Sequence, residues 1–117
     1  MYKNAQTFLT CKAYWVKIHI AGSLPLIKAA CQNYCDTKGL CVTVTPTDYI
    51  YTGGHETGAT VRLINYPRFP KSDKEIEDIA EELAHVILVE AGQESFTIET
   101  PIFSKFYSWR EQDQTQR

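Results

Sequence analysis

The chain has 117 residues, of which 44% are hydrophobic and 22% charged, and its formal net charge is −2. This length allows one domain with its own core but not two, and the composition is that of an ordinary globular protein. No stretch approaches the roughly 20 apolar residues of a membrane-spanning helix, and the first residues lack the hydrophobic segment of a signal peptide, which favours a soluble cytoplasmic protein.

The first part of the chain predicts a strand, a helix and a second strand. Residues 1–12 carry little pattern, and we expect them to form an arm. In residues 13–20 apolar and polar side chains alternate, which predicts a half-buried strand. Residues 23–38 predict a helix, and residues 40–45 predict the next strand. Pro46 places that strand at a sheet edge or a bulge, because proline cannot donate to the hydrogen-bond ladder.

The middle of the chain predicts a protruding hairpin arm. Residues 49–51 can extend the second strand, and the Gly-rich residues 52–58 are expected to form the linker that turns it. The return strand is predicted over residues 59–66.

The second helix has the clearest local signal. Ser72 followed by Glu75 is a capping box, and Gly92 supplies the stop of the helix. Residues 95–100 predict a fourth strand. Residues 101–117 form a tail that is aromatic at its start and polar at its end.

The order of these elements predicts an α+β fold. Strand, helix, strand, strand, helix, strand fits a ferredoxin-like βαββαβ sandwich, a four-stranded antiparallel sheet with both helices on one face. The predicted regions are an N-terminal arm (1–12), the ferredoxin-like domain (13–100) and the aromatic C-terminal tail (101–117). The other face of the sheet is left uncovered, so a partner is expected there.

The uncovered face mixes aromatic, apolar and cationic side chains. On the first and third strands it comprises Trp15, Lys17, His19, Arg62, Ile64 and Tyr66. We expect this face to bind a protein partner or a second copy of the chain as a homodimer. Two alternatives remain open, namely coverage by the aromatic tail and stacking of single-stranded nucleic acid bases.

The hairpin arm is the second candidate site. It comprises Tyr49, Tyr51, Gly53, Gly54 and His55. Aromatic side chains at a protruding tip can anchor an interface, whereas adjacent glycines can present backbone amides to an anion. A Gly-rich turn without a binding role is the simpler interpretation.

The cysteines favour packing over chemistry. Cys31 and Cys35 are four residues apart on a predicted helix, a spacing that would suit two metal ligands. Both fall in the apolar stripe of that helix, which predicts core packing, with metal or redox use as alternatives.

No catalytic signature is apparent. Acylphosphatases share the predicted fold, but their phosphate-binding loop contains an arginine, and residues 21–25 contain none. The histidines at positions 19, 55 and 85 are far apart in the sequence. The sequence therefore predicts no catalytic residue, metal site or cofactor, and it indicates a binding protein more than an enzyme.

Residues 41–54, Cys41-Val-Thr-Val-Thr-Pro-Thr-Asp-Tyr-Ile-Tyr-Thr-Gly-Gly, and residues 61–70, Val61-Arg-Leu-Ile-Asn-Tyr-Pro-Arg-Phe-Pro, resemble small uncharacterised proteins encoded by bacteriophages. The resemblance implies a protein that works in the cytoplasm of an infected bacterium, where compact phage proteins often bind host enzymes or defence factors. We therefore expect a small non-enzymatic binding protein that modulates or inhibits a bacterial protein. The alternatives are single-stranded nucleic acid binding through the open face, and binding or turnover of a small nucleotide or anion near the Gly-rich hairpin.

Overall fold

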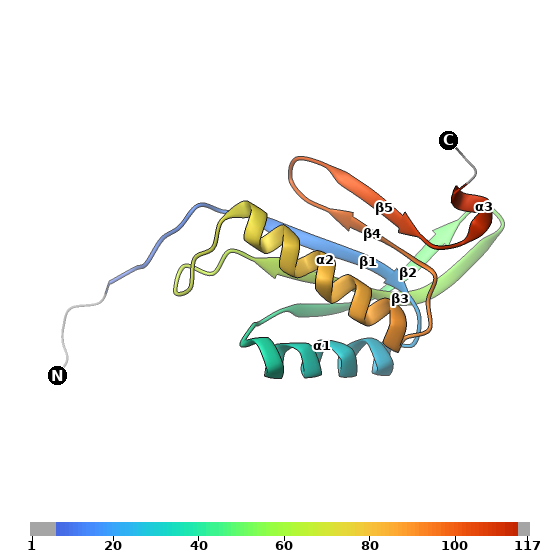
Figure 1. Cartoon of the computed structure of the whole chain (residues 1–117), viewed down its shortest axis with the longest axis horizontal. Coiled ribbons are helices and arrows are strands. Elements are labelled where there is room, and N and C mark those ends of the chain that lie inside the picture. The colour runs from blue at the N-terminus through green and yellow to red at the C-terminus, as the bar shows by residue number, and fades with distance from the viewer. Residues whose placement is uncertain (1–6, 115–117) are drawn as a thin grey trace.

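The computed structural model describes residues 7–114, with both main helices lying on the same side of one sheet (Figure 1). In chain order the elements are β1 (Trp15–Ala21), α1 (Leu24–Lys38), β2 (Thr43–Tyr51), β3 (Gly54–Ile64), α2 (Asp73–Glu90), β4 (Ser95–Glu99), β5 (Ser104–Ser108) and α3 (Glu111–Gln114). Within the described residues, no helix has the length and apolar character needed to cross a membrane.

The sheet confirms the predicted α+β class but has one strand more than predicted. Its strand order is β2-β3-β1-β4-β5, and every neighbouring pair is antiparallel. The prediction of four strands is wrong because part of the C-terminal tail pairs with β4. β2 lies at one edge of the sheet, which is where Pro46 predicts it, since that residue has no amide hydrogen to offer a further strand.

The additional strand, β5, comes from the aromatic part of the tail, for which coverage of the open sheet face was one alternative. Its pairing places Tyr107 opposite Phe96 and Phe106 opposite Thr97. The rings of Phe96 and Tyr107 stack with their centroids 5.1 Å apart, and His85 of α2 meets Tyr107 edge-on at 4.6 Å. The tail therefore adds a strand at the edge of the sheet, beside β4, and does not lie across the uncovered face of the sheet.

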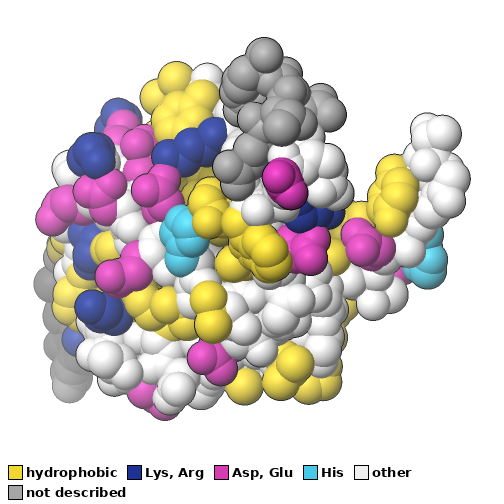
Figure 2. Space-filling model, turned by 45° about the vertical axis from the view of Figure 1, so that its right-hand side comes forward, with side chains coloured by type: hydrophobic (Ala, Val, Ile, Leu, Met, Phe, Trp, Pro, Cys, Tyr) yellow, Lys and Arg dark blue, Asp and Glu magenta, His cyan; other side chains and the backbone are white. Residues whose placement is uncertain are grey.

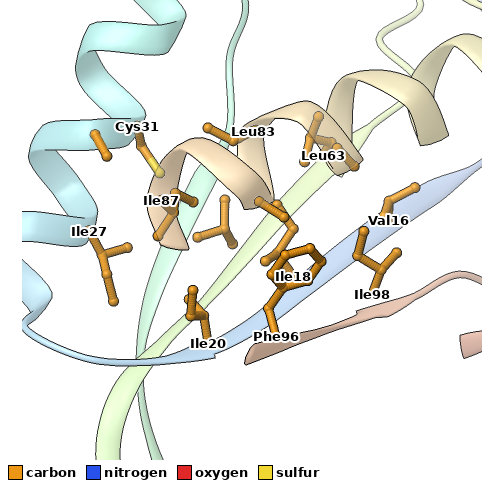
Figure 3. Packing of buried hydrophobic residues seen from close by; sticks show 14 of the residues in the cluster. Val16, Ile18, Ile20, Ile27, Cys31, Leu63, Leu83, Ile87, Phe96 and Ile98 are labelled. Carbon is orange, nitrogen blue, oxygen red and sulfur yellow. The ribbon is translucent and has the colours of Figure 1, made fainter. Parts of the chain in front are cut away.

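The core lies between the helices and the inward side of the sheet (Figure 3). The largest fully buried side chains are Val16, Ile18, Ile20, Ile27, Val61, Leu83, Ile87 and Ile98. β1 contributes alternate residues to this layer, because successive side chains of a strand point to opposite faces. Burying one such branched aliphatic side chain stabilises the fold by roughly 1.5–3 kcal/mol.

Local signals fix the start and the end of α2. The Ser72 hydroxyl accepts a hydrogen bond from the Glu75 amide at 3.1 Å, and the Glu75 carboxylate accepts one from the Ser72 amide at 2.8 Å. Gly92, with φ of 65°, turns the chain after α2. This turn brings the start of β4 beside the end of β1, where a cavity lies.

The hairpin arm is more regular than predicted. We expected residues 52–58 to form a linker, but the turn consists of Thr52 and Gly53, and β3 begins at Gly54. Gly53 has φ of 82°, a conformation that few other residues adopt easily. A short turn permits continuous pairing from Tyr51–Gly54 down to the body of the sheet, so the arm is a two-stranded ribbon.

Gly58 is a position where the β1–β3 pairing leaves no room for a side chain. A Cβ atom there would lie 2.2 Å from the backbone oxygen of Ile20 and 2.6 Å from the Cα of Ala21. Because both are backbone atoms, no rotamer change can relieve the contact. We predict that Gly58→Ala lowers the free energy of unfolding by about 1–3 kcal/mol, measured by urea denaturation.

The matched control is Thr57→Ala, at the exposed neighbouring position. It should change the free energy of unfolding by less than about 1 kcal/mol. Equal stability of Gly58→Ala and the unmodified chain would show that the strands separate at this point.

Candidate functional site

A cavity of about 430 Å³ lies where the end of β1 meets the base of the hairpin, the α2–β4 turn and β5. We call it the hairpin pocket. Its lining residues are His19, Ile20, Ala21, Tyr49, Tyr51, Glu56, Gly92, Gln93, Glu94, Ser95, Phe96, Thr97, Phe106 and Arg110. The space-filling view shows the hairpin projecting from the body of the molecule, with acidic and hydrophobic side chains next to each other at its base (Figure 2). The volume is within the range typical of small-molecule sites.

Aromatic rings form one part of the pocket. Tyr49 is held in place because its hydroxyl donates to the backbone oxygen of Ala59 at 2.7 Å. The ring of His19 meets Tyr49 edge-on, with the centroids 6.3 Å apart. Phe106 enters from β5 and leaves 57% of its surface exposed. Such rings offer flat apolar surface on which a planar ligand can stack.

Carboxylates supply most of the charge. Glu56 and Glu94 line the pocket together with a single arginine, Arg110. The Nε of Arg110 lies 2.8 Å from Asp113 Oδ2 and 3.8 Å from Glu94 Oε1, so its positive charge is already balanced. Hydrogen bonds from the Ser108 hydroxyl and then from Arg110 hold the pKa of Asp113 below its usual value. The pocket consequently favours a cation.

His19 connects the pocket to the uncovered face of the sheet. Its Nε2 lies 2.9 Å from Oε1 of Glu99 on the neighbouring strand β4. Together with the edge-on contact to Tyr49, this fixes the orientation of the imidazole ring. His19 is thus a hydrogen-bonding group at the wall of the pocket, with a carboxylate behind it.

The donor set of the site does not resemble a metal centre. Among residues 7–114, no group of three or more His, Cys, Asp or Glu side chains is arranged to hold a metal ion. What the hairpin pocket offers is a combination of stacking surface and negative charge. That combination suits an organic ligand with a flat heteroaromatic ring and a positive charge.

The structure brings together only some of the residues of the predicted partner face. Trp15 pairs with Ile64 and Lys17 with Arg62 across the β1–β3 ladder, and the Lys17 ammonium lies 5.2 Å from the centre of the Trp15 ring. His19 shares this face but turns toward the hairpin pocket. Tyr66 lies beyond the end of β3, so it does not join the other five on the strands.

The predicted arm residues divide into two groups. Tyr49 and Tyr51 line the hairpin pocket, whereas Gly53, Gly54 and His55 lie at the tip and do not. Four further lining residues were not among the predicted site residues, namely Glu56, Glu94, Phe106 and Arg110. Of these four, only Phe106 had a signal in the sequence, namely the aromatic character of the tail.

The cysteines occupy different environments. Cys31 is 3% exposed and belongs to the core, while Cys35 is half-buried and Cys41 is exposed. Burial, followed by the proximity of Cys35, raises the pKa of the Cys31 thiol to about 11. A buried thiol with a raised pKa forms little thiolate at neutral pH and reacts slowly.

Comparison of the whole chain with known proteins finds the fold in phage enzymes. One solved structure, described as a phage SAM lyase in the apo state, matches with a TM-score of 0.72 and 13% identity over 92% of this chain and 100% of that chain. A second, described as a phage SAM lyase in complex with S-methyl-5′-thioadenosine, matches with a TM-score of 0.61 at the same identity and coverage. No protein-family model and no curated protein matches the sequence. At this level of identity, what is shared is the fold.

This similarity overturns the prediction of a non-enzymatic binding protein, because the matching structures are described as enzymes. The two alternatives are single-stranded nucleic acid binding through the open face, and binding or turnover of a small nucleotide or anion near the Gly-rich hairpin; neither is better supported by these matches. Both matching proteins are phage proteins, in agreement with the phage resemblance of the middle of the sequence.

Thiol labelling tests the placement of the cysteines. We predict that, at about pH 8, Cys41 reacts first with a disulfide reagent and Cys31 stays unmodified in the folded protein, because its thiolate is scarce and shielded. The measurement is the time course of thionitrobenzoate release from the native and the denatured chain.

The variants Cys31→Ser and Cys41→Ser show which cysteine gives rise to each kinetic phase of the labelling reaction. Cys41→Ser should remove the fast phase, and Cys31→Ser should leave it unchanged. The opposite pattern would place Cys31 at the surface.

Proposed function

We propose that this chain is an S-adenosylmethionine lyase that releases S-methyl-5′-thioadenosine, with the hairpin pocket as its substrate site. The observation that carries the proposal is the match, over nearly the whole of both chains, to phage SAM lyase structures, one of them in complex with S-methyl-5′-thioadenosine. The chemistry of the hairpin pocket supports it independently.

The charge of the pocket complements this substrate. S-adenosylmethionine carries a sulfonium and an ammonium group against a single carboxylate, so it is a net cation. Glu56 and Glu94 favour such a ligand, while Arg110 is balanced by Asp113 and Glu94 and does not oppose it. The rings of Tyr49 and Phe106 provide stacking surface for adenine.

The proposed reaction breaks the bond between the sulfonium sulfur and the γ-carbon of the methionine portion. The bonding electron pair goes to sulfur, which becomes the neutral thioether of S-methyl-5′-thioadenosine. A lyase adds no water, so the γ-carbon must form its new bond within the departing portion. Either that portion's own carboxylate oxygen attacks the γ-carbon and closes a lactone, or a β-proton is lost to solvent and a carbon–carbon double bond forms. The protein's task is then to hold the substrate in a reactive conformation.

The carboxylates are expected to act mainly on substrate binding. Positive charge on sulfur disappears as the bond breaks, so a nearby carboxylate stabilises the bound substrate at least as much as the transition state. Removing one should therefore raise KM and leave kcat unchanged or slightly higher.

We further infer a ferredoxin-like core to which β5 has been added, supported by the order β2-β3-β1-β4 of the other four strands and by the placement of both helices on one face. The phage neighbours and the phage resemblance of the sequence support an origin in a bacteriophage, with the bacterial cytoplasm as the place of action.

The direct test is incubation of the purified chain with S-adenosylmethionine, with S-methyl-5′-thioadenosine measured by liquid chromatography. We predict enzyme-dependent release of this product. Glu56→Gln and Glu94→Gln should each raise KM by about three- to tenfold with kcat unchanged or slightly higher, because each removes one partly exposed charge from the site.

Glu90→Gln is the matched control, since Glu90 is an exposed residue of α2 that does not line the pocket. It should leave both constants unchanged. S-adenosylhomocysteine lacks the sulfonium charge, so it should bind the pocket more weakly than S-adenosylmethionine does when the two compete. Absence of product from a folded, monodisperse preparation would refute the proposal.

A further inference from the structure

A second cavity, of about 470 Å³, lies at the opposite end of the β1–β3 ladder from the hairpin pocket. We call it the helix-end pocket. Its walls come from the last turn of α1 with the residues after it, the end of β3 with the loop that follows, and the first two turns of α2. Leu63, Ile76 and Ile79 form part of its apolar wall.

The charges around the helix-end pocket are the reverse of those in the hairpin pocket. Its lining contains two cationic residues, Arg68 and Lys71, and no aspartate or glutamate. Within residues 7–114, neither cation forms an ion pair. Glu75 is the carboxylate that interacts electrostatically with Lys71: its pKa is lowered first by the hydrogen bonds of the Ser72 cap and then by the charge of Lys71. The two cations thus remain available to an anion.

The loop that carries these cations is held rigidly by Asn65, which is 8% exposed. Its side-chain amide donates to the backbone oxygen of Lys12 at 2.8 Å, and its side-chain oxygen accepts from the Lys71 amide at 2.9 Å. Its backbone amide donates to the backbone oxygen of Tyr14 at 2.9 Å. One buried amide therefore ties the loop to the segment before β1 and fixes the backbone of Lys71.

Two further contacts shape the mouth of the pocket. Tyr66 and Phe69 pair as an isolated bridge, and the Phe69 amide donates to the Tyr66 backbone oxygen at 3.0 Å. The Arg68 guanidinium lies 5.4 Å from the centre of the Phe69 ring. The Tyr66 hydroxyl donates to the Sγ of Cys41 at 3.0 Å. A preformed apolar cavity with a few placed polar groups is the usual form of a small-molecule site.

We propose that the helix-end pocket binds a small amphipathic anion, with an aliphatic or aromatic body against the apolar wall and a carboxylate or sulfonate head between Arg68 and Lys71. The size of the cavity, its apolar wall and the unopposed positive charge at its rim each favour this class of ligand. A cationic nucleoside such as S-adenosylmethionine does not suit it, so this inference stands apart from the proposed lyase activity.

The probe for this site is 8-anilinonaphthalene-1-sulfonate, an aromatic body with one anionic head whose fluorescence rises in apolar surroundings. We expect saturable one-to-one binding by the full chain. Arg68→Gln combined with Lys71→Gln should weaken it about tenfold, because two rim charges are lost. Arg62→Gln combined with Lys17→Gln, which removes two cations from the uncovered sheet face, should leave it unchanged.

Competition experiments show whether charge or hydrophobicity drives the binding of the probe. They also show whether the probe occupies the helix-end pocket or the hairpin pocket. Decanoate should displace the probe and decanol should do so poorly, whereas S-methyl-5′-thioadenosine should not displace it. Ile79→Trp should abolish binding by filling the cavity, with circular dichroism and the melting temperature confirming its fold. Equal displacement by decanol and decanoate, unchanged affinity in the Arg68 and Lys71 variant, or displacement by S-methyl-5′-thioadenosine would each overturn the proposal.

Discussion

The pairing of β1 with β3 is the constraint on which the rest of the structure depends. Opposite pairs run from Trp15–Ile64 at one end to Ala21–Gly58 at the other, and this register buries Val16, Ile18 and Ile20 against the helices. A slip by one residue would move this apolar set to the solvent side, so the burial of β1 specifies the register strongly. The same register fixes where each end of the ladder meets the helices and loops, and both pockets lie at those ends.

The two pockets differ in the charge that their surroundings leave unbalanced. At the Ala21 end, the α2–β4 turn and the hairpin bring two glutamates to aromatic rings, and the one arginine is balanced by acidic neighbours. At the Ile64 end, the loop after β3 brings Arg68 and Lys71 to an apolar wall without a carboxylate in the lining. The lining of the two pockets thus differs in the sign of its charge, and the proposals of a cationic ligand for one and an anionic ligand for the other rest on this difference.

The sequence predicted the elements with strong periodicity and missed those without it. Alternation in β1 was sufficient to assign this strand and its two faces, and the capping box with Gly92 was sufficient to locate α2. β5 was not predicted, because its aromatic residues Phe106 and Tyr107 are consecutive and point to opposite sides of the sheet. The strand therefore lacks the alternation of apolar and polar residues that identified β1. The hairpin pocket could not be predicted, because Glu56, Glu94 and Arg110 come from three segments that meet only in the folded chain.

Nuclear magnetic resonance of the ¹⁵N-labelled chain during titration with S-methyl-5′-thioadenosine tests the central claim most directly. If the hairpin pocket is the substrate site, the backbone amide signals of Ala21, Glu56 and Thr97 should shift in proportion to ligand binding, while those of Gly39, Ile64 and Lys71 stay in place. Shifts concentrated on Gly39, Ile64 and Lys71, or the absence of any shift at saturating ligand, would contradict the assignment of the hairpin pocket as the substrate site.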